Sequence, residues 1–497
     1  MTTPCSVRAP SAALPRPNEL QLQTAHSIGG AWISSARTFT VHSPIDWPHP
    51  LAEVPRGDAA TVDRAVQAAQ QAFPAWASLS PEERAVYLER LACLIEANAE
   101  RIASIECLDV GMLYRSLRER LVFRAARNYR FAARVACEYG EPTWTTDGLR
   151  TRVTAMPAGP AAIIIPWNAP FMLATWKTAA ALAAGCTVVL KPPEWAPLSC
   201  CLLAELVEQA AFPPGVFNVV HGIGEEVGAA LVRHPGIRRI SFTGSTETGR
   251  RIGAQAGANL VPYTAELGGK SPFVVFADAD LEAAARMAAM QYDDAGQICF
   301  AGTRLLVDES VAEPFLERFV AAVARHVLGD PREPETTIAP LIHPEHLARV
   351  EGFVERARRD GARVLVGGRR ATEVGRLWYV PTLIMPRHND QEIVQREVFG
   401  PVLTLQLFRS EAEAIQLANS TAYGLAAVVY TESAVRADRV ARSLRAGTVW
   451  INTWAARDLA APFGGIGDSG MGREGGRWGL EFYSDLKAIQ RREEGTK

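Results

Sequence analysis

Cys299 lies in the segment D-A-G-Q-I-C-F-A-G, which runs from Asp294 to Gly302. Cysteine acts as a nucleophile in its thiolate form, and a free thiol is already partly ionised at neutral pH. A buried structural cysteine is inert, whereas a working one needs a partly exposed setting tuned by nearby charge. The chain has eight cysteines, so residue type alone does not choose between these two interpretations.

Two further side chains could complete a covalent reaction on a carbonyl group. Attack by a thiolate produces a tetrahedral oxyanion, which needs preorganised hydrogen-bond donors. Asn168 can offer its side-chain amide, and the backbone N–H of Cys299 is the expected second donor. If the adduct then loses a hydride, a thioester remains, and Glu266 can activate the water that cleaves it if burial raises the Glu266 pKa toward the working pH. The alternatives are that Asn168 caps a helix before Pro170 and that Glu266 is a solvated carboxylate at a strand end.

Arginine carries almost all the positive charge of the chain. Only five of the 52 basic residues are lysines, at positions 177, 191, 270, 487 and 497. Such a chain can retain lysine where a compact ammonium is specifically required. The alternative is that these five lysines occur by coincidence, and the sequence around each lysine must distinguish the two interpretations.

The apolar pattern indicates a helical region followed by two α/β series. Residues 59–136 are rich in Ala, Arg and Glu with helical spacing. Apolar runs then occur at 161–165, 187–190, 217–220 and 239–242, and a second series has runs at 273–276, 304–307, 402–407, 426–430 and 447–451. Helical patterns at 281–290 and 311–326 separate the first runs of the second series. This texture predicts two α/β domains, each with a mostly parallel sheet covered on both faces.

Loops that could bind a ligand follow four runs of the first series, where doubly wound sheets place their sites. They read I-P-W-N-A-P, K-P-P-E-W-A-P, H-G-I-G-E-E-V-G and T-G-S-T-E-T-G. The G-x-G-x-x-G fingerprint is absent, because Gly222, Gly224 and Gly228 are spaced one residue too wide. Gly244 and Gly249 frame a candidate helix N-terminus for a pyrophosphate. Four ordinary strand-to-helix connections are the alternative.

Composition and charge argue against several classes of protein. A net charge of −2 without a basic tail gives no field that attracts nucleic acid or an anionic membrane. No apolar run approaches the about 20 residues that span a bilayer, and the first 20 residues favour a disordered leader over a secretory signal or a weak transit peptide. Eight cysteines without a C-x-x-C pair favour a reducing, cytoplasmic compartment. The pair His343 and His346 is better explained by a turn that leads into a helix than by a metal site, so no metal is expected.

Seven motifs occur in one order along the chain. They are Pro166-Trp-Asn168, Lys191-Pro-Pro-Glu194, Phe242-Thr-Gly-Ser-Thr246, Glu266-Leu-Gly-Gly-Lys270, Gly296-Gln-x-Cys299, Glu397-Val-Phe-Gly-Pro401 and Pro462-Phe-Gly-Gly465 with Gly472-Arg-Glu474. In this order and spacing the chain resembles the NAD(P)-dependent aldehyde dehydrogenases from about residue 25 onward. Lys191 and Lys270 lie inside these motifs and Lys177 matches a further position of the family, so three of the five lysines stand at family positions, which argues against coincidence.

The resemblance implies a fold of two doubly wound α/β domains, one a Rossmann-like cofactor domain and one catalytic, with a small β oligomerisation arm. The expected boundaries are a disordered leader at 1–24, an NAD-binding domain at 25–136 and 158–265, a catalytic domain at 266–465, and an arm at 137–157 and 484–497. The charged tail at 491–497 is expected to fray. A homodimer or homotetramer is expected from the family.

By resemblance, Cys299 is the nucleophile, Glu266 the general base and Asn168 the oxyanion-hole residue, while Lys177 and Glu474 match a pair that relays protons. The positions that match cofactor contacts are Ile165, Pro166, Trp167, Lys191, Glu194, Gly224, Phe242, Thr243, Gly244, Ser245, Leu267, Gly268, Glu397 and Phe399. A carboxylate at Glu194 would bind free ribose hydroxyls and repel a 2′-phosphate, so NAD is favoured over NADP. The chain departs from the family at Gly467, where lysine is common, and at Asp294, where asparagine is usual.

The substrate pocket is expected to be apolar with a charged mouth. Its expected walls are Phe171, Trp176, Ile298, Phe300, Trp454 and Phe463, and large rings at these places are alternatively core. The segment Asn452-Thr-Trp-Ala-Ala-Arg457-Asp-Leu resembles that of the hydroxymuconic and aminomuconic semialdehyde dehydrogenases. That subgroup draws a second arginine from the N-terminal helical region, where Arg124 is the candidate and Arg127 and Arg130 are close alternatives. Two such arginines would hold a substrate carboxylate, unless they are merely solvated surface groups.

Two other activities compete with NAD-dependent oxidation of an aldehyde to an acid. A CoA-acylating enzyme would use the same cysteine, but the hydrolytic base expected at Glu266 works against acyl transfer to a thiol. A cofactor-free cysteine hydrolase needs a histidine to activate the sulfur, and none of the nine histidines lies in a motif that suggests this.

Overall fold

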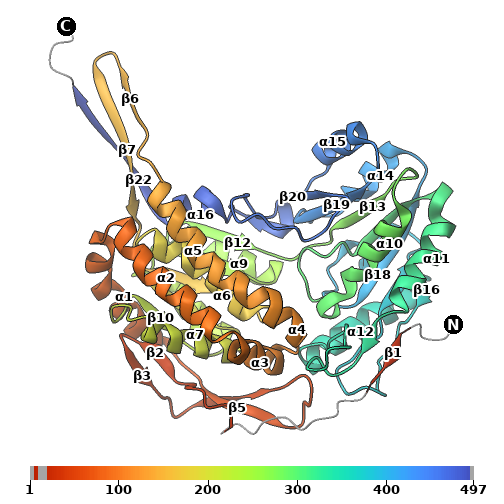
Figure 1. Cartoon of the computed structure of the whole chain (residues 1–497), viewed down its shortest axis with the longest axis horizontal. Coiled ribbons are helices and arrows are strands. Elements are labelled where there is room, and N and C mark those ends of the chain that lie inside the picture. The colour runs from red at the N-terminus through yellow and green to blue at the C-terminus, as the bar shows by residue number, and fades with distance from the viewer. Residues whose placement is uncertain (1–4, 9–18, 493–497) are drawn as a thin grey trace.

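The apolar runs of the first series form the centre of an eight-stranded sheet, as the computed structural model of the chain shows for the residues it describes, 5–8 and 19–492 (Figure 1). The strand order is β21-β12-β11-β8-β9-β10-β2-β3. The bounds are β8 (Ala161–Ile164), β9 (Val188–Lys191), β10 (Phe217–Val219), β11 (Arg239–Thr243), β12 (Tyr263–Glu266), β21 (Gly470–Met471), β2 (His26–Ile28) and β3 (Ala31–Ile33). The five strands from β10 to β12 are parallel and the edge strands are antiparallel, so the predicted doubly wound sheet is confirmed.

The second series forms five strands of a seven-stranded sheet in the order β16-β17-β18-β14-β13-β19-β20, in which β16 and β17 were not predicted. Its members are β13 (Pro272–Val275), β14 (Arg304–Asp308), β16 (Arg363–Val366), β17 (Thr382–Met385), β18 (Val402–Phe408), β19 (Ala426–Tyr430) and β20 (Thr448–Ile451). All neighbours are parallel except β16 and β17. The central strands are buried throughout because helices cover both faces, and each buried Val, Leu or Ile contributes about 1.5–3 kcal/mol.

The predicted helical region is confirmed as α1 (Ala59–Ser78), α2 (Pro81–Ala97), α3 (Ala99–Val110), α4 (Tyr114–Ser116), a π-helical turn at Leu117–Leu121, and α5 (Val122–Glu138). Local sequence sets where two of these helices begin. Asp58 caps α1 through the backbone N–H of Thr61, and Ser80 caps α2 just before Pro81. Helix α2 packs along α5, and α5 packs along α6 (Pro170–Ala183), the first helix of the first α/β series.

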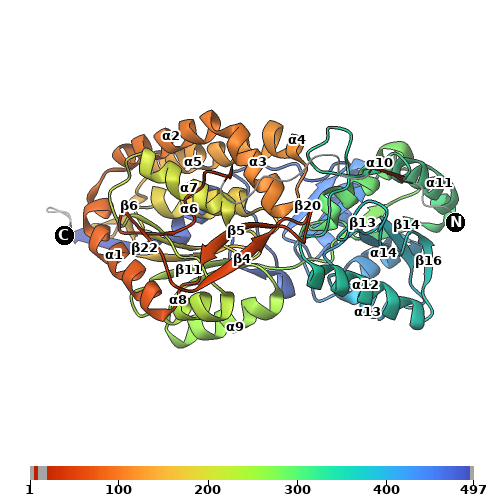
Figure 2. The same ribbon diagram turned by 90° about the horizontal axis from the view of Figure 1, so that it is seen from below.

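Figure 2 shows helices on both faces of the first sheet, with α2, α6 and α7 (Leu198–Gln209) on one side and α8 (Ala229–Arg233) and α9 (Thr246–Ala258) on the other. The second sheet lies between α10 and α11 above and α12 below in the same view. The helices of this half are α10 (Leu281–Ala289), α11 (Ala312–Val323), α12 (Pro344–Arg359), α13 (Glu392–Gln395), α14 (Glu411–Ala418) and α15 (Ala434–Ser443). No helix in the described part of the chain is long and apolar enough to cross a bilayer.

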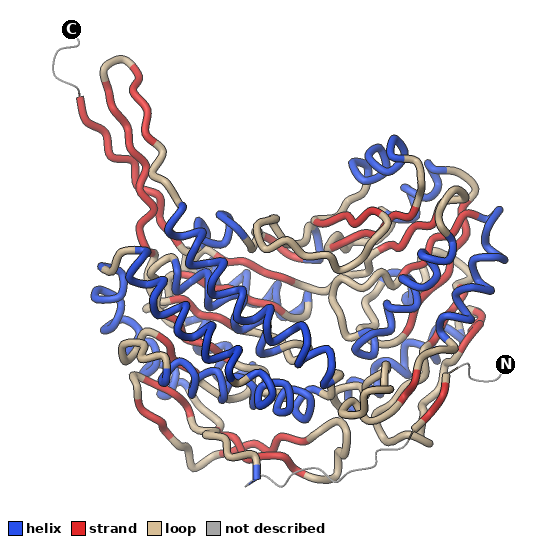
Figure 3. The backbone as a smooth tube through the Cα atoms, in the orientation of Figure 1, coloured by secondary structure: helices blue, strands red, loops and turns tan. Residues whose placement is uncertain are grey.

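A three-stranded antiparallel arm projects from the body of the molecule (Figure 3). It consists of β6 (Thr143–Thr146), β7 (Leu149–Pro157) and β22 (Ser484–Arg492), which follows α16 (Gly476–Phe482). The tail does not fray at residue 491 as predicted, because Arg491 and Arg492 pair with Arg150 and Leu149 on β7. Residues 493–497 of the predicted tail lie outside the described residues.

The predicted disordered leader is wrong for its described residues 5–8. Strand β1 (Ser6–Val7) pairs in parallel with β15 (Val327–Leu328) in the second half. The Cys5 side chain is buried and donates to the carbonyl of Val323 at 3.3 Å, so burial and backbone pairing hold the segment. The rest of the leader before residue 19 lies outside the described residues. Strands β4 (Thr38–His42) and β5 (Pro50–Pro55) form a separate antiparallel pair that the apolar pattern did not predict.

Candidate active site

Cys299 lies in the loop that connects α10 to β14, after a run of left-handed residues. Asp294, Ala295 and Gly296 have φ values of 49°, 54° and 70°. A Cβ on Gly296 would come within 2.3 Å of the Gly400 carbonyl oxygen, so this close approach requires glycine. Aspartate tolerates the left-handed region as asparagine does, which accommodates the departure at Asp294. Cys299 is partly exposed, whereas each of the other cysteines is either buried or exposed.

The electrostatic setting of Cys299 is dominated by burial and by two carboxylates. Burial raises the pKa of the thiol to about 12, and the nearby Glu397 and Glu266 contribute to the rise, while Arg457 works in the opposite direction. The resting sulfur is therefore a thiol, and a base is needed to ionise it. Among the described residues, no histidine is part of this setting.

Asn168 is close to the cysteine loop and does not cap a helix. Its Nδ2 donates to the Gln297 carbonyl at 2.9 Å, two residues before Cys299. Helix α6 begins at Pro170 with Ala169 at its N-cap position, and no side chain of its own caps it. The interpretation of Asn168 as a helix cap is therefore wrong. An amide nitrogen has two hydrogens, so one remains available to a ligand.

Glu266 is the last residue of β12 and is only 5% exposed. Both of its carboxyl oxygens lack a hydrogen-bond partner among the residues that the structure describes. Burial, followed by the nearby Glu474 carboxylate, raises its pKa well above the usual range, although Lys177 and Arg457 oppose the shift. A Cβ on Gly464 would lie 2.9 Å from Glu266 Oε1, so bare backbone lines this side of the carboxyl. Glu266 is not the solvated strand-end carboxylate of the alternative interpretation.

Lys177 and Glu474 form a buried pair beside Glu266. Lys177 Nζ lies 2.5 Å from Glu474 Oε1 and 2.9 Å from Ser241 Oγ, and Ser241 also donates to Glu474. Trp176 Nε1 donates to the second oxygen of Glu474 at 2.7 Å. A pocket borders this network, and Trp176, Lys177 and Glu474 are among its walls. The pair therefore lies near Glu266 and also lines this pocket.

The loops after β9 and β10 meet at Lys191 and Glu194. Lys191 Nζ lies 2.6 Å from Glu194 Oε2, and the backbone N–H of Gly224 donates to Glu194 Oε1 at 3.5 Å. Burial opposes ionisation of Glu194, but the Lys191 ammonium outweighs it and lowers the pKa. Glu194 is therefore a carboxylate at neutral pH. Ile165, which directly follows β8, lies beside these residues, since its backbone N–H donates to the Lys191 carbonyl at 3.4 Å.

The loop after β11 closes tightly on the start of α9. Ser245 is the N-cap, and its hydroxyl accepts from the backbone N–H of Thr248 at 3.2 Å. A Cβ on Gly244 would lie 2.4 Å from the Phe242 ring, and one on Gly249 would lie 2.5 Å from Leu267. These glycines let the chain turn closely enough to expose backbone N–H groups at a helix N-terminus, which suits an anion.

Glu397 lies beside the loop that follows β12, and Phe399 lies beside Trp167. Glu397 Oε1 accepts from Gly269 N at 2.8 Å, and a Cβ on Gly268 would lie only 2.3 Å from Glu397 Oε2. Burial raises the pKa of Glu397 to about 7. Phe399 has a φ of 60°, and its ring packs edge-on against Trp167 with centroids 5.3 Å apart. Thr243, at the end of β11, keeps a buried hydroxyl without a partner.

Aromatic rings surround Phe300 on the other side of Cys299. The ring centroids of Trp450, Trp454 and Phe463 lie 5.6, 5.8 and 6.4 Å from that of Phe300. Ile298 is partly exposed beside them. Phe171 was predicted to line the pocket, but it is 1% exposed and packs in the core because the first turn of α6 points it inward. That prediction is corrected.

Two arginines lie near each other at this apolar wall. Arg457 Cζ lies 3.6 Å from the centre of the Phe463 ring and 5.7 Å from that of Trp176. Burial, followed by the positive charge of Arg457, lowers the pKa of Arg124 to about 10. Arg124 Nε is buried and has no hydrogen-bond partner within the described part of the chain. Arg130 is instead paired with Glu89 and Glu96, so it is not the second arginine.

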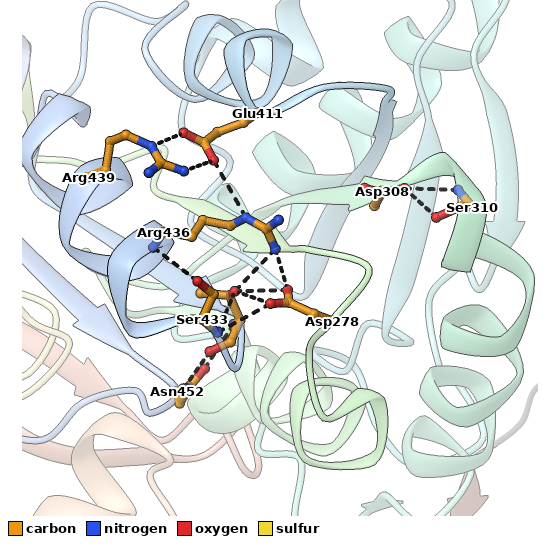
Figure 4. Close-up of polar contacts among 9 residues, drawn as sticks. Asp278, Asp308, Ser310, Glu411, Ser433, Arg436, Arg439 and Asn452 are labelled. Carbon is orange, nitrogen blue, oxygen red and sulfur yellow. Dashed lines mark hydrogen bonds and ion pairs between the residues drawn. The ribbon is translucent and has the colours of Figure 1, made fainter.

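A hydrogen-bond network holds the base of the loop that carries Arg457 (Figure 4). Asn452 accepts from the N–H of Thr431 at 3.1 Å and donates to its carbonyl at 2.9 Å. Asp278 in turn accepts from the Thr431 hydroxyl, the Ser433 N–H and Arg436. The start of the loop is therefore fixed to β19 and α15 rather than free to move with Arg457.

The sequence profile of the aldehyde dehydrogenase family matches residues 32–489. The chain belongs to this family. It is 40% identical over 479 residues to a 2-hydroxymuconic semialdehyde dehydrogenase of Pseudomonas sp. (strain CF600), covering 93% of this chain and 98% of that protein. It is 38% identical over 471 residues to a 2-aminomuconic semialdehyde dehydrogenase of Danio rerio, covering 93% and 96%.

Solved structures share the fold. HpcC from Thermus thermophilus superposes with a TM-score of 0.92 at 45% identity, covering 94% of this chain and 93% of that one. The P. syringae indole-3-acetaldehyde dehydrogenase AldA, in a complex with NAD+ and IAA, superposes with a TM-score of 0.93 at 36% identity, covering 97% and 100%.

Ser241 is a residue of this aldehyde dehydrogenase site that sequence reasoning missed. It stands at the centre of β11, is fully buried, and bonds both Lys177 and Glu474. The available signal was a lone hydroxyl in the apolar run R-I-S-F. Such a residue needs a partner when buried, but the sequence did not say which.

Proposed function

We propose that this aldehyde dehydrogenase oxidises an aldehyde that also carries a carboxylate, a semialdehyde of aromatic ring-cleavage metabolism, with NAD as the hydride acceptor. The observation that carries the proposal is the Arg124–Arg457 pair beside Cys299. Neither arginine forms an ion pair within the described residues, and two partly buried guanidiniums without an anion are costly. A substrate carboxylate would supply that anion. Two relatives are named as dehydrogenases of muconic semialdehydes, which supports a substrate of this class.

The residues at the first sheet fit NAD. Ser245 with Gly244 and Gly249 would hold the pyrophosphate at the N-terminus of α9. The charged Glu194 suits free ribose hydroxyls and disfavours a 2′-phosphate, and Glu397 would hold the second ribose. When bound, NAD supplies the acceptor for the aldehyde hydrogen.

The chain's own residues supply the rest of the reaction. The Cys299 sulfur attacks the carbonyl carbon after losing its proton to Glu266, which passes that proton to the Lys177–Glu474 pair and is a carboxylate again before hydrolysis. The amide of Asn168 and the N–H of Cys299 stabilise the oxyanion. After the hydride has left, Glu266 takes a proton from the water that attacks the thioester carbon, and the thiol leaves with the acid released. The Lys177–Glu474 pair would then carry the proton away from Glu266.

The two halves and the arm have separate roles in this proposal. The first half, 25–136 with 158–265, binds NAD, and the second, 266–465, carries Cys299. The arm, 137–157 with the C-terminal strand, exposes Trp144, Met156, Leu486 and Ile489, which a homodimer or homotetramer would cover. All eight cysteines are free, which agrees with a cytoplasmic protein.

NADH formation is the test of the proposal. The purified enzyme is given acidic, aromatic and aliphatic aldehydes of matched length, with NAD or NADP and without CoA, and absorbance is followed. We expect NADH with the acidic aldehydes at the highest kcat/KM and a weaker reaction with NADP. A requirement for CoA would favour the acyl-transfer enzyme, and ester hydrolysis without NAD binding would favour the hydrolase; either result overturns the proposal.

A further inference from the structure

Helix α3 carries two buried carboxyl groups on one face. Glu106 and Asp109 are three residues apart, a spacing that places both side chains on one side of a helix. Glu106 is 2% exposed and Asp109 is fully buried. Burying an ionisable group is costly unless it makes a specific bond, so each needs a structural reason.

Each carboxyl accepts a hydrogen bond from the first turn of a different helix. Glu106 Oε1 accepts from the N–H of Phe171 in α6 at 3.1 Å. Asp109 Oδ2 accepts from the N–H of Leu198 in α7 at 2.7 Å. Neither α6 nor α7 has a capping side chain at its own N-cap position. The first N–H groups of a helix have no partner within it, so α3 supplies the caps that these two helices lack.

Each of these two helices begins where a loop that carries site residues ends. Helix α6 follows β8 and the loop of Asn168, and α7 follows β9 and the loop of Glu194. A fixed first turn of a helix determines where the preceding loop must end. The loops are only a few residues long, so a shift of that turn is passed to the site side chain.

We propose that Glu106 and Asp109 are positioning residues that hold two parts of the site separately. Glu106 sets the place of Asn168 opposite Cys299, and Asp109 sets the place of the Lys191–Glu194 pair. One face of α3 thereby fixes the distance between the oxyanion donor and the cofactor edge. The inference rests on the proposed function, because it uses the roles assigned there to Asn168 and Glu194.

Amide variants preserve the acceptor oxygen. Burial raises the pKa of Glu106 to about 8, opposed by the Phe171 N–H and reinforced by Asp294. Burial also raises the pKa of Asp109 well above its usual range, opposed by the N–H of Leu198. Glu106 is therefore mainly neutral at pH 7, and burial favours the neutral form of Asp109 as well, so Gln and Asn are close isosteres of the protonated acids.

The test separates chemistry from cofactor binding. Glu106→Ala is expected to lower kcat at saturating NAD by about tenfold or more, because misplacing a catalytic group by about 1 Å can cost about 100-fold. Its Kd for NAD, read from quenching of tryptophan fluorescence, is expected to stay within about twofold. Asp109→Ala is expected to raise that Kd by about tenfold and leave kcat at saturating NAD within about threefold. Glu106→Gln and Asp109→Asn should restore most of each loss.

Glu100→Ala is the matched control, because Glu100 lies on the same helix with its side chain 79% exposed. Parallel losses of kcat and NAD affinity in both alanine variants, or no rescue by the amides, would overturn the inference. If an alanine variant does not fold, Glu106→Asp and Asp109→Glu are measured instead, since each displaces the acceptor by one methylene. Glu106→Asp must then affect mainly kcat, and Asp109→Glu mainly the Kd for NAD. Fluorescence titration needs no turnover, so an Asp109 effect on NAD binding is readable even if the acidic aldehydes fail as substrates.

Discussion

Arg457 and Arg124, which are 333 positions apart in the chain, lie close enough for the charge of one to lower the pKa of the other. Like charges are brought together in a folded protein only when other interactions compensate. Here Arg457 stacks on Phe463, and Asn452 fixes the base of its loop. Under the proposed function, a substrate anion would bind between the two groups.

Removing either arginine should impair binding of acidic aldehydes selectively. Arg124→Ala is expected to raise KM for a carboxylate-bearing aldehyde about 10–100-fold, since a hydrogen bond to a charged group contributes about 1.5–3 kcal/mol. A neutral aldehyde of equal length should change little. Arg127→Ala, exposed on the same helix, is the control. Equal losses for acidic and neutral aldehydes in kinetic assays would contradict a carboxylate site.

Arg457→Ala should show the same selectivity together with a lower kcat. Arg457 lies near Cys299 and Glu266 and lowers the pKa of both, so its loss makes both groups harder to ionise. The pH profile of kcat is therefore expected to move to higher pH in Arg457→Ala. A profile unchanged from the parent would show that Arg457 acts on the substrate alone.

Glu266→Gln should separate acyl-enzyme formation from hydrolysis. A rapid burst of NADH, up to about one per site, is expected to persist in part while steady turnover falls by about 100-fold or more, because general base catalysis typically contributes about 10²–10⁴-fold. Cys299→Ala should remove both phases, whereas Cys93→Ala, at an exposed cysteine, should remove neither. Stopped-flow absorbance measures the burst; steady turnover at the parental rate in Cys299→Ala would rule out the covalent route.

The buried Glu266 should also make the stability of the protein depend on pH. Its pKa is raised on folding, so the native state binds more protons than the unfolded state and stability falls as pH rises above the unfolded value of about 4.5. Glu266→Gln removes this penalty. The variant is expected to melt at a higher temperature than the parent at pH 8, with a smaller difference at pH 5, in thermal scans. A constant difference across that range would contradict an ionisable, unpartnered carboxyl.

The Lys177–Glu474 pair should behave as a coupled buried ion pair. In Lys177→Met the Glu474 carboxyl keeps Trp176 and Ser241 as its hydrogen-bond donors from the described residues, and breaking such an ion pair typically costs about 3–5 kcal/mol. The double variant Lys177→Met with Glu474→Gln is expected to lose less than the sum of the single variants in denaturant unfolding. Additive losses would mean that the two side chains stabilise the protein independently.

Much of the sheet architecture was predictable because strands buried on both faces appear as short apolar runs. The runs from 161 to 242 and from 273 to 451 correspond to nine parallel strands of the two sheets, whereas the parallel strands β12 and β17 were not predicted. The short strands at Ser6–Val7 and Gly470–Met471 were not predicted, because they pair at sheet edges and have no apolar run of their own. Phe171 was misplaced for a related reason, since a large ring near a motif does not show which side of its helix faces the core.

The sequence by itself determined the chemical types at the site and their order along the chain: a cysteine after Gly-Gln-Ile, a carboxylate before Leu-Gly-Gly, and an asparagine after Pro-Trp. Only the tertiary structure decided which arginine faces Arg457, that Ser241 joins Lys177 and Glu474, and that Glu106 and Asp109 cap α6 and α7. The reason is physical. Motif spacing along the chain reflects local turns and helix starts, whereas pairing, burial and the resulting pKa shifts depend on residues that only folding brings within a few ångströms.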